Sequence, residues 1–457
     1  MLATRPFLKI AFASAISLLL LTAFLLSSQR YQQLNLLLPP LLSKLQQHGS
    51  KDILQVYLTD TSLSHDEVIA AYVHSFGSQP NINMSLFQTE SRYGMSDIVS
   101  NFTLPRPVPE PLHPSTVGGP LVPDIMITST CNFDFNNLKD RYNEFLKLGK
   151  TYVFCTIHHA DWWNKEDMEE RLKPWIDKNL ISIVFLSAHT ARYFKEYGMS
   201  NWQAPTRKKA SKVVKVLTPV FPVSLPSLSD SVSDTIHIPA KNATPPHVSG
   251  IENEIAFALQ GNYESSRRDF KRVFSDLESL LKSSDTNTLS SSSNPSSHPT
   301  KNITLHLLGH GPNPPKVPEN LKPHVIFDED LPYPAYYNLL SHCTAVLPAF
   351  ASPEYLDRKA SSSVPAALLG GVPLIADKDL VGNYSYLGAD TFYLQDSHEG
   401  AGLGKTELEV MQAIIKMPEE QRIHMKKRVR ERSEDLQREN VEMVARWIRE
   451  ARRRVGV

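Results

Sequence analysis

Short apolar runs alternate with amphipathic segments from about residue 51 onward. Runs such as TYVFCTI (151–157) and ISIVFL (181–186) are apolar without strict alternation, which is typical of strands buried on both faces of a parallel sheet. The segments between them repeat apolar residues at helical spacing. The pattern therefore predicts an α/β fold in which helices cover parallel sheets.

Two series of such elements follow one another along the chain. In the first series, strands are expected at 53–58, 124–128, 151–157 and 181–186, with helices near 136–148, 167–178 and 190–197. In the second series, strands are expected at 254–260, 304–308, 324–327, 345–347, 373–376 and 391–394, with helices near 265–282, 335–341, 364–369 and 406–416.

The segments between and after these series set the predicted domain borders. A Ser-, Pro- and Asn-rich stretch, 224–250, is expected to link an N-terminal domain (51–223) to a C-terminal domain (251–418). Residues 283–300 have almost no apolar side chains and are expected to be a disordered insertion. The charged segment 419–457 is expected to form a pair of helices packed on the body, in preference to a coiled coil that binds a partner.

The N-terminus has the features of a membrane anchor. Residues 10–28 carry no charge and, as a helix, nearly match a hydrocarbon core of about 30 Å. Arg5 and Lys9 precede this stretch, so the positive-inside rule predicts a cytoplasmic tail (1–9), a single type II span (10–28) and a lumenal stem (29–50). The alternative is a cleaved signal peptide, but the apolar stretch is longer than usual for one.

Composition and short motifs agree with a lumenal body. The chain has 48 basic and 48 acidic residues, so it has no overall field for nucleic acid. The three cysteines are too few for a disulfide scaffold; Cys131 and Cys155 can pair, and Cys343 lies in an apolar context. Acceptor tripeptides for N-glycosylation occur at Asn83, Asn101, Asn242, Asn302 and Asn383.

The segment 348–377 (PAFASPEYLDRKASSSVPAALLGGVPLIAD) predicts a loop and a very short helix between two strands. Ser361, Ser362 and Ser363 are suited to the start of this helix, where free N–H groups and the helix dipole attract anions. Lys359 stands just before them. The segment is either a diphosphate site or an ordinary capped helix beside a surface lysine.

This segment resembles the donor-binding stretch of GT-B glycosyltransferases, in particular the family-4-like group. Glu354, Lys359 and the run SSSVPAALLGGVPLIA (361–376) carry the resemblance, together with IAFALQGN (255–262), the arginines that follow it and LHLLGHG (305–311). The resemblance covers about residues 250–400. It implies two Rossmann-like domains facing a cleft, with the nucleotide-sugar donor on the C-terminal one.

By position, the resemblance places donor-binding residues along the C-terminal domain. Backbone at Gly261 and Asn262 would approach the nucleotide, and Arg267 or Arg268 would reach the diphosphate together with Lys359. Without the resemblance, the arginine pair reads as a solvated helix face. Where the family has a second glutamate, eight positions after Glu354, this chain has Ser362.

In the N-terminal domain, His158, His159 and Asp161 follow a predicted strand, at the edge of the sheet where ligands bind in open α/β folds. A histidine here is expected to act on the acceptor hydroxyl or to hold the donor, with Asp161 orienting the imidazole. Two alternatives remain: the cluster binds a metal, or the histidines pack beside Trp162 and Trp163.

These features predict an enzyme that moves a sugar, with retention of configuration, from a UDP- or GDP-linked donor to a glycan, glycoprotein or glycolipid acceptor. It is expected to lie in the membrane of the Golgi or endoplasmic reticulum and to require no metal or other cofactor. Ser362 at the glutamate position motivates the alternative of a catalytically silent protein that binds glycans or a partner. A lumenal hydrolase using His158, His159 and Asp161 is disfavoured because no Gly-x-Ser-x-Gly motif or complete zinc motif is present.

Overall fold

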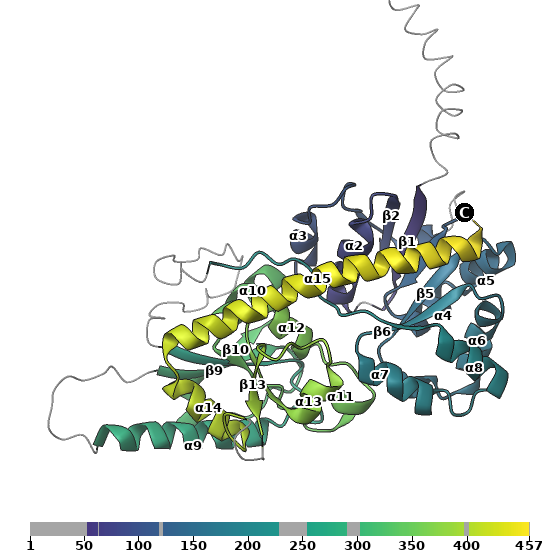
Figure 1. The fold of residues 1–457 in the computed structure, drawn as a ribbon. Helices are drawn as coiled ribbons and strands as arrows, with labels where there is room; N and C mark the ends of the chain where they lie inside the picture. The colour runs from purple at the N-terminus through teal and green to yellow at the C-terminus, as the bar shows by residue number, and fades with distance from the viewer. Residues whose placement is uncertain are drawn as a thin grey trace, which may run out of the picture. The chain divides into compact units, whose positions relative to one another are not determined.

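The computed structural model describes residues 53–62, 64–117, 122–227, 254–289, 302–396 and 402–456. It contains two parallel sheets, both within one compact unit, Gln55–Val457 (Figure 1). The predicted α/β architecture is confirmed. The predicted anchor, residues 10–28, lies outside the described residues, and none of the helices that are described is long and apolar enough to cross a bilayer.

The first sheet has the strand order β3-β2-β1-β4-β5-β6-β7. Its strands are β1 (Leu54–Asp60), β2 (Ile82–Gln88), β3 (Pro111–Leu112), β4 (Ile125–Thr128), β5 (Tyr152–Ile157), β6 (Ile181–Phe185) and β7 (Val214–Val216). The helices between them are α2 (Asp66–Gly77), α3 (Met95–Ser100), α4 (Cys131–Asn137), α5 (Lys139–Leu148), α6 (Glu166–Asp177), α7 (Ala188–Tyr193) and α8 (Ala204–Lys212). Short helical turns add η1 (Pro114–Thr116), η2 (Ala160–Trp163) and η3 (Phe194–Gly198).

The second sheet has the order β10-β9-β8-β11-β12-β13. Its strands are β8 (Glu254–Gln260), β9 (Asn302–Gly309), β10 (Val325–Glu329), β11 (Ala345–Val346), β12 (Leu374–Asp377) and β13 (Phe392–Gln395), and all neighbours run parallel. Its helices are α9 (Phe270–Leu289), η5 (Glu319–His324), α10 (Tyr333–His342), α11 (Glu354–Asp357), α12 (Ser363–Gly370), α13 (Lys378–Asn383) and α14 (Glu407–Lys416).

Burial explains why the central elements form where they do. Every residue of β5 and β6 is buried, as expected for strands covered on both faces. Every residue of α12 is buried as well, which fits a helix that is apolar on all sides. These elements form the cores against which the site-bearing loops are held.

The predicted strands of both series are present, but several elements were missed. α2, β2 and α3 were not predicted, nor were β3, β7 and α8. Most residues of α2 are buried, so it has no polar face to produce a helical pattern. The predicted helix 136–148 is interrupted at Leu138 between α4 and α5.

Two further predictions are corrected at the C-terminal side of the chain. Residues 283–289 belong to α9 and not to an insertion. The expected helix pair at 419–457 is a single helix, α15 (Glu419–Val455). Figure 1 shows α15, in yellow, running from the second sheet's domain across to the first, and it packs on α12, α2 and β5.

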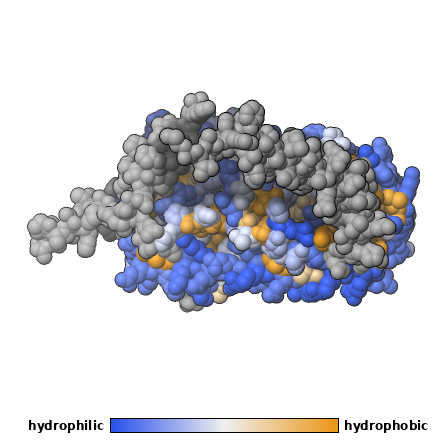
Figure 2. All heavy atoms as spheres, turned by 90° about the horizontal axis from the view of Figure 1, so that it is seen from above, coloured by the Kyte–Doolittle hydropathy of each residue, from blue (hydrophilic) through white to orange (hydrophobic). Residues whose placement is uncertain are grey.

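On the face drawn in Figure 2, apolar side chains form separate small groups among hydrophilic ones. The predicted glycosylation sites differ in accessibility. Asn83, Asn101 and Asn302 are exposed, whereas Asn383 is half-buried and its side chain accepts a hydrogen bond from Arg192. Asn242 lies outside the described residues.

Candidate functional site

A cavity of about 200 Å³ lies between the two sheets' domains, at the carboxyl ends of their central strands. In each sheet the strand order reverses next to the first strand of the domain, β1 or β8. Loops at such a reversal leave a crevice for ligands. The first domain contributes His65, Glu67, Val68, His158, His159, Leu186 and Pro219 to the lining, and the second contributes a larger set that begins at Gln260.

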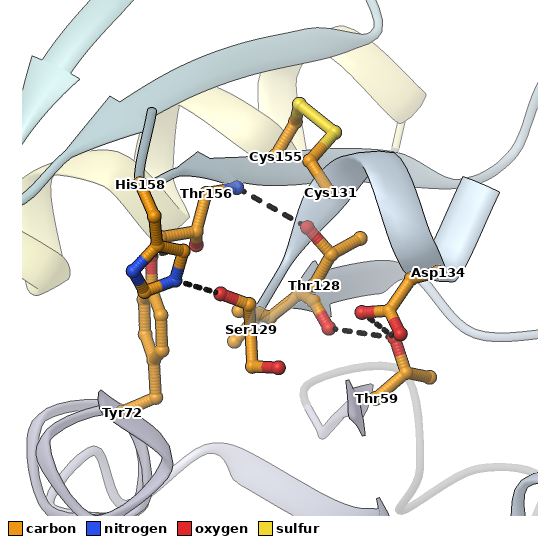
Figure 3. The surroundings of a disulfide bond; sticks show 10 residues. Thr59, Tyr72, Thr128, Ser129, Cys131, Asp134, Cys155, Thr156 and His158 are labelled. Atoms are coloured by element: carbon orange, nitrogen blue, oxygen red, sulfur yellow. Dashed lines mark hydrogen bonds between the residues drawn. A yellow bond between two sulfur atoms is a disulfide. The ribbon is translucent and has the colours of Figure 1, made fainter. Parts of the chain in front are cut away.

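His158 follows β5 and forms part of the first domain's wall. Its ring stacks on the His65 ring at a centroid distance of 3.6 Å, and its Nε2 donates a hydrogen bond to the Ser129 carbonyl oxygen at 2.8 Å (Figure 3). Burial lowers the pKa of His158 to about 4. The imidazole is therefore neutral at physiological pH, with the proton on Nε2 and a basic Nδ1.

His159 is the neighbouring wall residue. It stacks on Trp162 at 4.0 Å, so the alternative of packing beside a tryptophan also describes it. Burial, and then the nearby Lys359 charge, lower the pKa of His159 to about 4. Its Nδ1 is buried without a hydrogen-bond partner in the described part of the chain.

Asp161 does not orient either imidazole, which corrects the expectation from sequence. Its Oδ2 lies 3.6 Å from Arg358 Nε, an ion pair between the two domains. Asp161 is also absent from the described lining of the cavity. In the described residues, no group of three His, Cys, Asp or Glu side chains is arranged to hold a metal ion.

Arg268 is the buried cation of the second domain's wall and is only 3% exposed. Its Nε donates to the Gln260 carbonyl at 3.0 Å, and its NH2 group donates to Ser363 Oγ at 2.8 Å. The guanidinium also lies over the rings of Phe350 and Tyr355. No acidic side chain pairs with it in the part of the chain that the structure describes. Because a buried charge without an ion-pair partner is costly even when it is hydrogen-bonded, this arrangement favours an anionic ligand.

Gly261 directly follows β8, beside this arginine. Its φ of 135° lies in a region that other residues rarely adopt, and a Cβ there would come within 2.9 Å of Arg268 NH2. Glycine therefore lets the chain turn above the guanidinium. Gly261 and Asn262 both line the cavity, where the sequence places close approach of backbone to a ligand.

The serine turn lies at the start of α12 and borders the cavity. Ser361 and Ser362 line it, while Ser363 lies behind them and accepts from Arg268. The turn is held by Tyr384, whose hydroxyl accepts from the Ser361 N–H at 2.8 Å. Ser362, at the N-cap position, makes no capping bond through its side chain, but the Ser361 hydroxyl accepts from the Ser363 N–H at 3.3 Å, so one of the three predicted serines does satisfy an N–H at the start of the helix.

Lys359 and Arg267 are the other cations of the cavity. Lys359 Nζ donates to Glu354 Oε2 at 2.6 Å, and Arg267 is 47% exposed and pairs with Glu264 at 2.8 Å. Glu354 itself is absent from the described lining. The Lys359 side chain is therefore less free than a surface lysine, yet it remains beside the predicted anion site.

The two walls are in direct contact on both sides of the cavity. On one side, the backbones of His159 and Lys359 form an antiparallel bridge, and the Ala160 N–H donates to the Arg358 carbonyl at 3.2 Å. On the other side, the Tyr333 N–H donates to the Tyr93 carbonyl at 2.6 Å. The described site is thus a cavity whose walls come from both domains and are in contact with each other.

Sequence reasoning assigned no role to several polar residues of the lining, including His65, Glu67 and Tyr337. His65 and Glu67 lie at the start of α2, and Tyr337 lies on α10. Their position after β1 was the signal that could have identified the first two, because loops after central strands carry ligands. Tyr337 lies in a helix rich in aromatic residues, a pattern that indicates burial in the hydrophobic core and not a binding site.

Comparisons with known proteins agree with this architecture. No protein-family profile and no curated protein matches the chain. The solved structure of HepE from Anabaena in complex with UDP and glucose aligns at 10% identity with a TM-score of 0.50, covering 87% of this chain and 100% of that chain. Sucrose-phosphate synthase from Thermosynechococcus elongatus aligns at 12% identity with a TM-score of 0.49, covering 87% and 98%.

A putative UDP-N-acetylglucosamine 2-epimerase from Listeria monocytogenes aligns less well, at 10% identity and a TM-score of 0.42, covering 82% of this chain and 91% of that one. At such identities a likeness concerns the fold alone. The chain therefore has the fold expected from the GT-B resemblance: two parallel-sheet α/β domains with a cavity between them.

Proposed function

We propose that the protein is a glycosyltransferase that moves a sugar from a nucleoside-diphosphate sugar to a glycan, glycoprotein or glycolipid acceptor. The observation that carries this proposal is Arg268, a buried cation beside the start of α12 with no acidic partner in the described chain. Breaking a sugar–phosphate bond develops negative charge on the leaving diphosphate. Fixed cations and helix N–H groups stabilise that charge.

The rest of the cavity fits the same reaction. Arg267 and Lys359 line it with Arg268, and the neutral His158 and His159 lie on the opposite wall. In this proposal the second domain binds the donor, and a histidine of the first domain contacts the donor sugar or the acceptor hydroxyl. HepE, whose fold this chain shares, was solved with UDP and glucose, which supports a nucleotide sugar as donor.

We also propose a cellular compartment and a stereochemical outcome for the reaction. We place the protein in the membrane of the Golgi or endoplasmic reticulum, anchored by residues 10–28 as a type II protein. The disulfide between Cys131 and Cys155 supports this, because such bonds persist in oxidising compartments (Figure 3). Transfer is proposed to retain the anomeric configuration, on the resemblance to the family-4-like group.

Donor binding tests the function directly. Calorimetry on the full-length protein in detergent should detect UDP- or GDP-sugars. Lys359→Ala should weaken UDP or GDP about tenfold and leave the free nucleoside nearly unchanged, because in this proposal the lysine binds the diphosphate and not the nucleoside. The exposed Lys271 of α9, outside the cavity, provides the matched control Lys271→Ala.

Two results would count against the proposal. No binding of any nucleotide or nucleotide sugar would exclude it. Binding of a donor without transfer to glycan acceptors would favour the alternative of a catalytically silent protein. Equal losses of nucleotide and nucleoside in Lys359→Ala would refute the phosphate role of that residue.

A further inference from the structure

Charge is unevenly distributed around the cavity. Three basic side chains, Arg267, Arg268 and Lys359, lie on the second domain's wall, and Glu67 is the one acidic side chain among the described lining residues. A diphosphate is attracted to the arginines and repelled by the glutamate. The part of a ligand that lies against Glu67 is therefore uncharged or carries hydroxyl groups.

Glu67 has hydrogen-bonding capacity to spare. It lies in the first turn of α2, accepts a hydrogen bond from the Tyr333 hydroxyl and forms no ion pair within the described chain. A carboxylate offers about four lone-pair sites on its two oxygens. Burial of the side chain raises the pKa of Glu67 above its ordinary value.

Tyr337 lines the same cavity from the opposite domain. It is 1% exposed, and its hydroxyl has no hydrogen-bond partner among the residues described. Buried tyrosine hydroxyls normally find a partner, so an unsatisfied one in a cavity wall points to a group supplied by a ligand. The phenol can donate one hydrogen bond and accept others.

We infer that Glu67 and Tyr337 form a subsite for the hydroxyl groups of a sugar ring belonging to the nucleotide-sugar donor. The inference rests on the proposed function. A carboxylate accepts from two neighbouring hydroxyls, and the phenol donates to one of them, so the pair matches a vicinal diol. Both the ribose of the nucleotide and the transferred sugar have this chemistry.

The subsite also has a structural consequence. Glu67 belongs to the first domain and Tyr337 to the second. A ring bound between them is held by both domains, while the diphosphate is held by the second. Donor binding is thereby coupled to contact between the domains.

Single-atom variants test the inference with little effect on folding. Tyr337→Phe removes a hydroxyl that has no partner, and Glu67→Gln keeps an oxygen for Tyr333. Tyr336→Phe is the matched control, because the Tyr336 hydroxyl is also buried and unpaired but that residue is absent from the described lining. Thermal unfolding of each variant checks that the fold is retained.

Binding is measured by calorimetry on the full-length protein with UDP, 2′-deoxy-UDP, UDP-glucose, GDP and GDP-mannose. Glu67→Gln should weaken the binding probes about tenfold or more, Tyr337→Phe about 3- to 10-fold, and Tyr336→Phe not measurably. If the ring is ribose, the loss appears with UDP and is absent with 2′-deoxy-UDP. If it is the transferred sugar, the loss appears only with the sugar nucleotides.

The outcomes for the subsite and for the function are separable. Unchanged affinity of both variants for every probe that binds the wild type overturns the subsite and leaves the proposed function standing. Loss in Tyr336→Phe equal to that in Tyr337→Phe also overturns it. If the wild type binds none of the probes, the proposed function fails and the subsite fails with it.

Discussion

The two histidines at the end of β5 are neutral because burial disfavours the charged imidazolium. Their pKa values are lowered to about 4, against 6.5 for an unperturbed histidine. The unfolded chain therefore binds protons below pH 6.5 that the folded chain does not bind until about pH 4. This proton uptake lowers the free energy of unfolding across that pH range.

The lowered pKa of His158 should reduce the free energy of unfolding between pH 7.5 and pH 5 by at most about 2 kcal/mol. His158→Asn should make the acid dependence shallower by that amount in urea unfolding at the two pH values. The exposed His424 supplies the control His424→Asn, whose profile should follow the wild type. Parallel profiles for wild type and His158→Asn would contradict the assigned neutrality.

Arg267 and Arg268 are adjacent in the sequence but have different surroundings in the structure. Arg267 is exposed and paired with Glu264, whereas Arg268 is buried and bonded to Ser363. From the sequence, either arginine is predicted to reach a diphosphate, since both follow the same glycine turn. Only the tertiary structure distinguishes the buried Arg268 from the exposed Arg267, although both line the cavity.

Among the elements, β5 leads into the loop that presents the histidines, and a disulfide joins β5 to the start of α4. The disulfide joins Cys131, the first residue of α4, to Cys155 within β5. It closes a segment with a sequence separation of 24 residues. The possible pairing that the sequence indicated is thereby confirmed, and Cys343 is a buried free thiol as expected.

Removal of this disulfide is expected to destabilise the protein. The double variant Cys131→Ala/Cys155→Ala should lose about 3 kcal/mol of stability, because the unfolded chain regains the entropy of an open loop. Urea unfolding with and without reductant measures the effect. Reductant should destabilise the wild type and leave the variant unchanged; equal responses would mean that the bond does not stabilise the domain.

For the whole molecule, α15 connects the two domains through side-chain packing. Trp447, near its end, stacks on Phe154 of β5 at 5.7 Å and lies 5.5 Å from Lys215 Nζ. Earlier in the helix, the side chain of Asn440 donates to the Thr218 carbonyl at 2.7 Å. The helix thus covers part of the first domain although it follows the second in the chain.

Trp447→Ala should therefore destabilise the protein by about 3–5 kcal/mol, the usual cost of removing a large buried aromatic side chain. Denaturant unfolding measures the change. Arg449, two residues away and exposed, serves as control: Arg449→Ala should change stability by less than about 0.5 kcal/mol. A loss for Trp447→Ala as small as that of the control would show that α15 packs loosely on the first domain.

Local sequence patterns were sufficient for the elements whose burial is uniform. The apolar runs of β5, β6 and β8 and the capped, fully apolar α12 were recognisable, because burial on every side leaves a continuous signature along the chain. The single helix α15 was mistaken for a pair because its buried stripe, which runs from Val429 to Ala451, includes the polar residues Ser433 and Asn440 and so looks interrupted in an apolar pattern.

The composition of the site was decided by tertiary structure. The order of strands and the contact between domains bring Glu67 to Tyr337 and turn Asp161 toward Arg358. The spacing of apolar residues predicts whether a residue is buried but not which residues pack against it. Contacts between distant segments therefore cannot be predicted from local sequence patterns. The sequence identified which loops carry polar chemistry, and packing between the domains decided which of their side chains share one cavity.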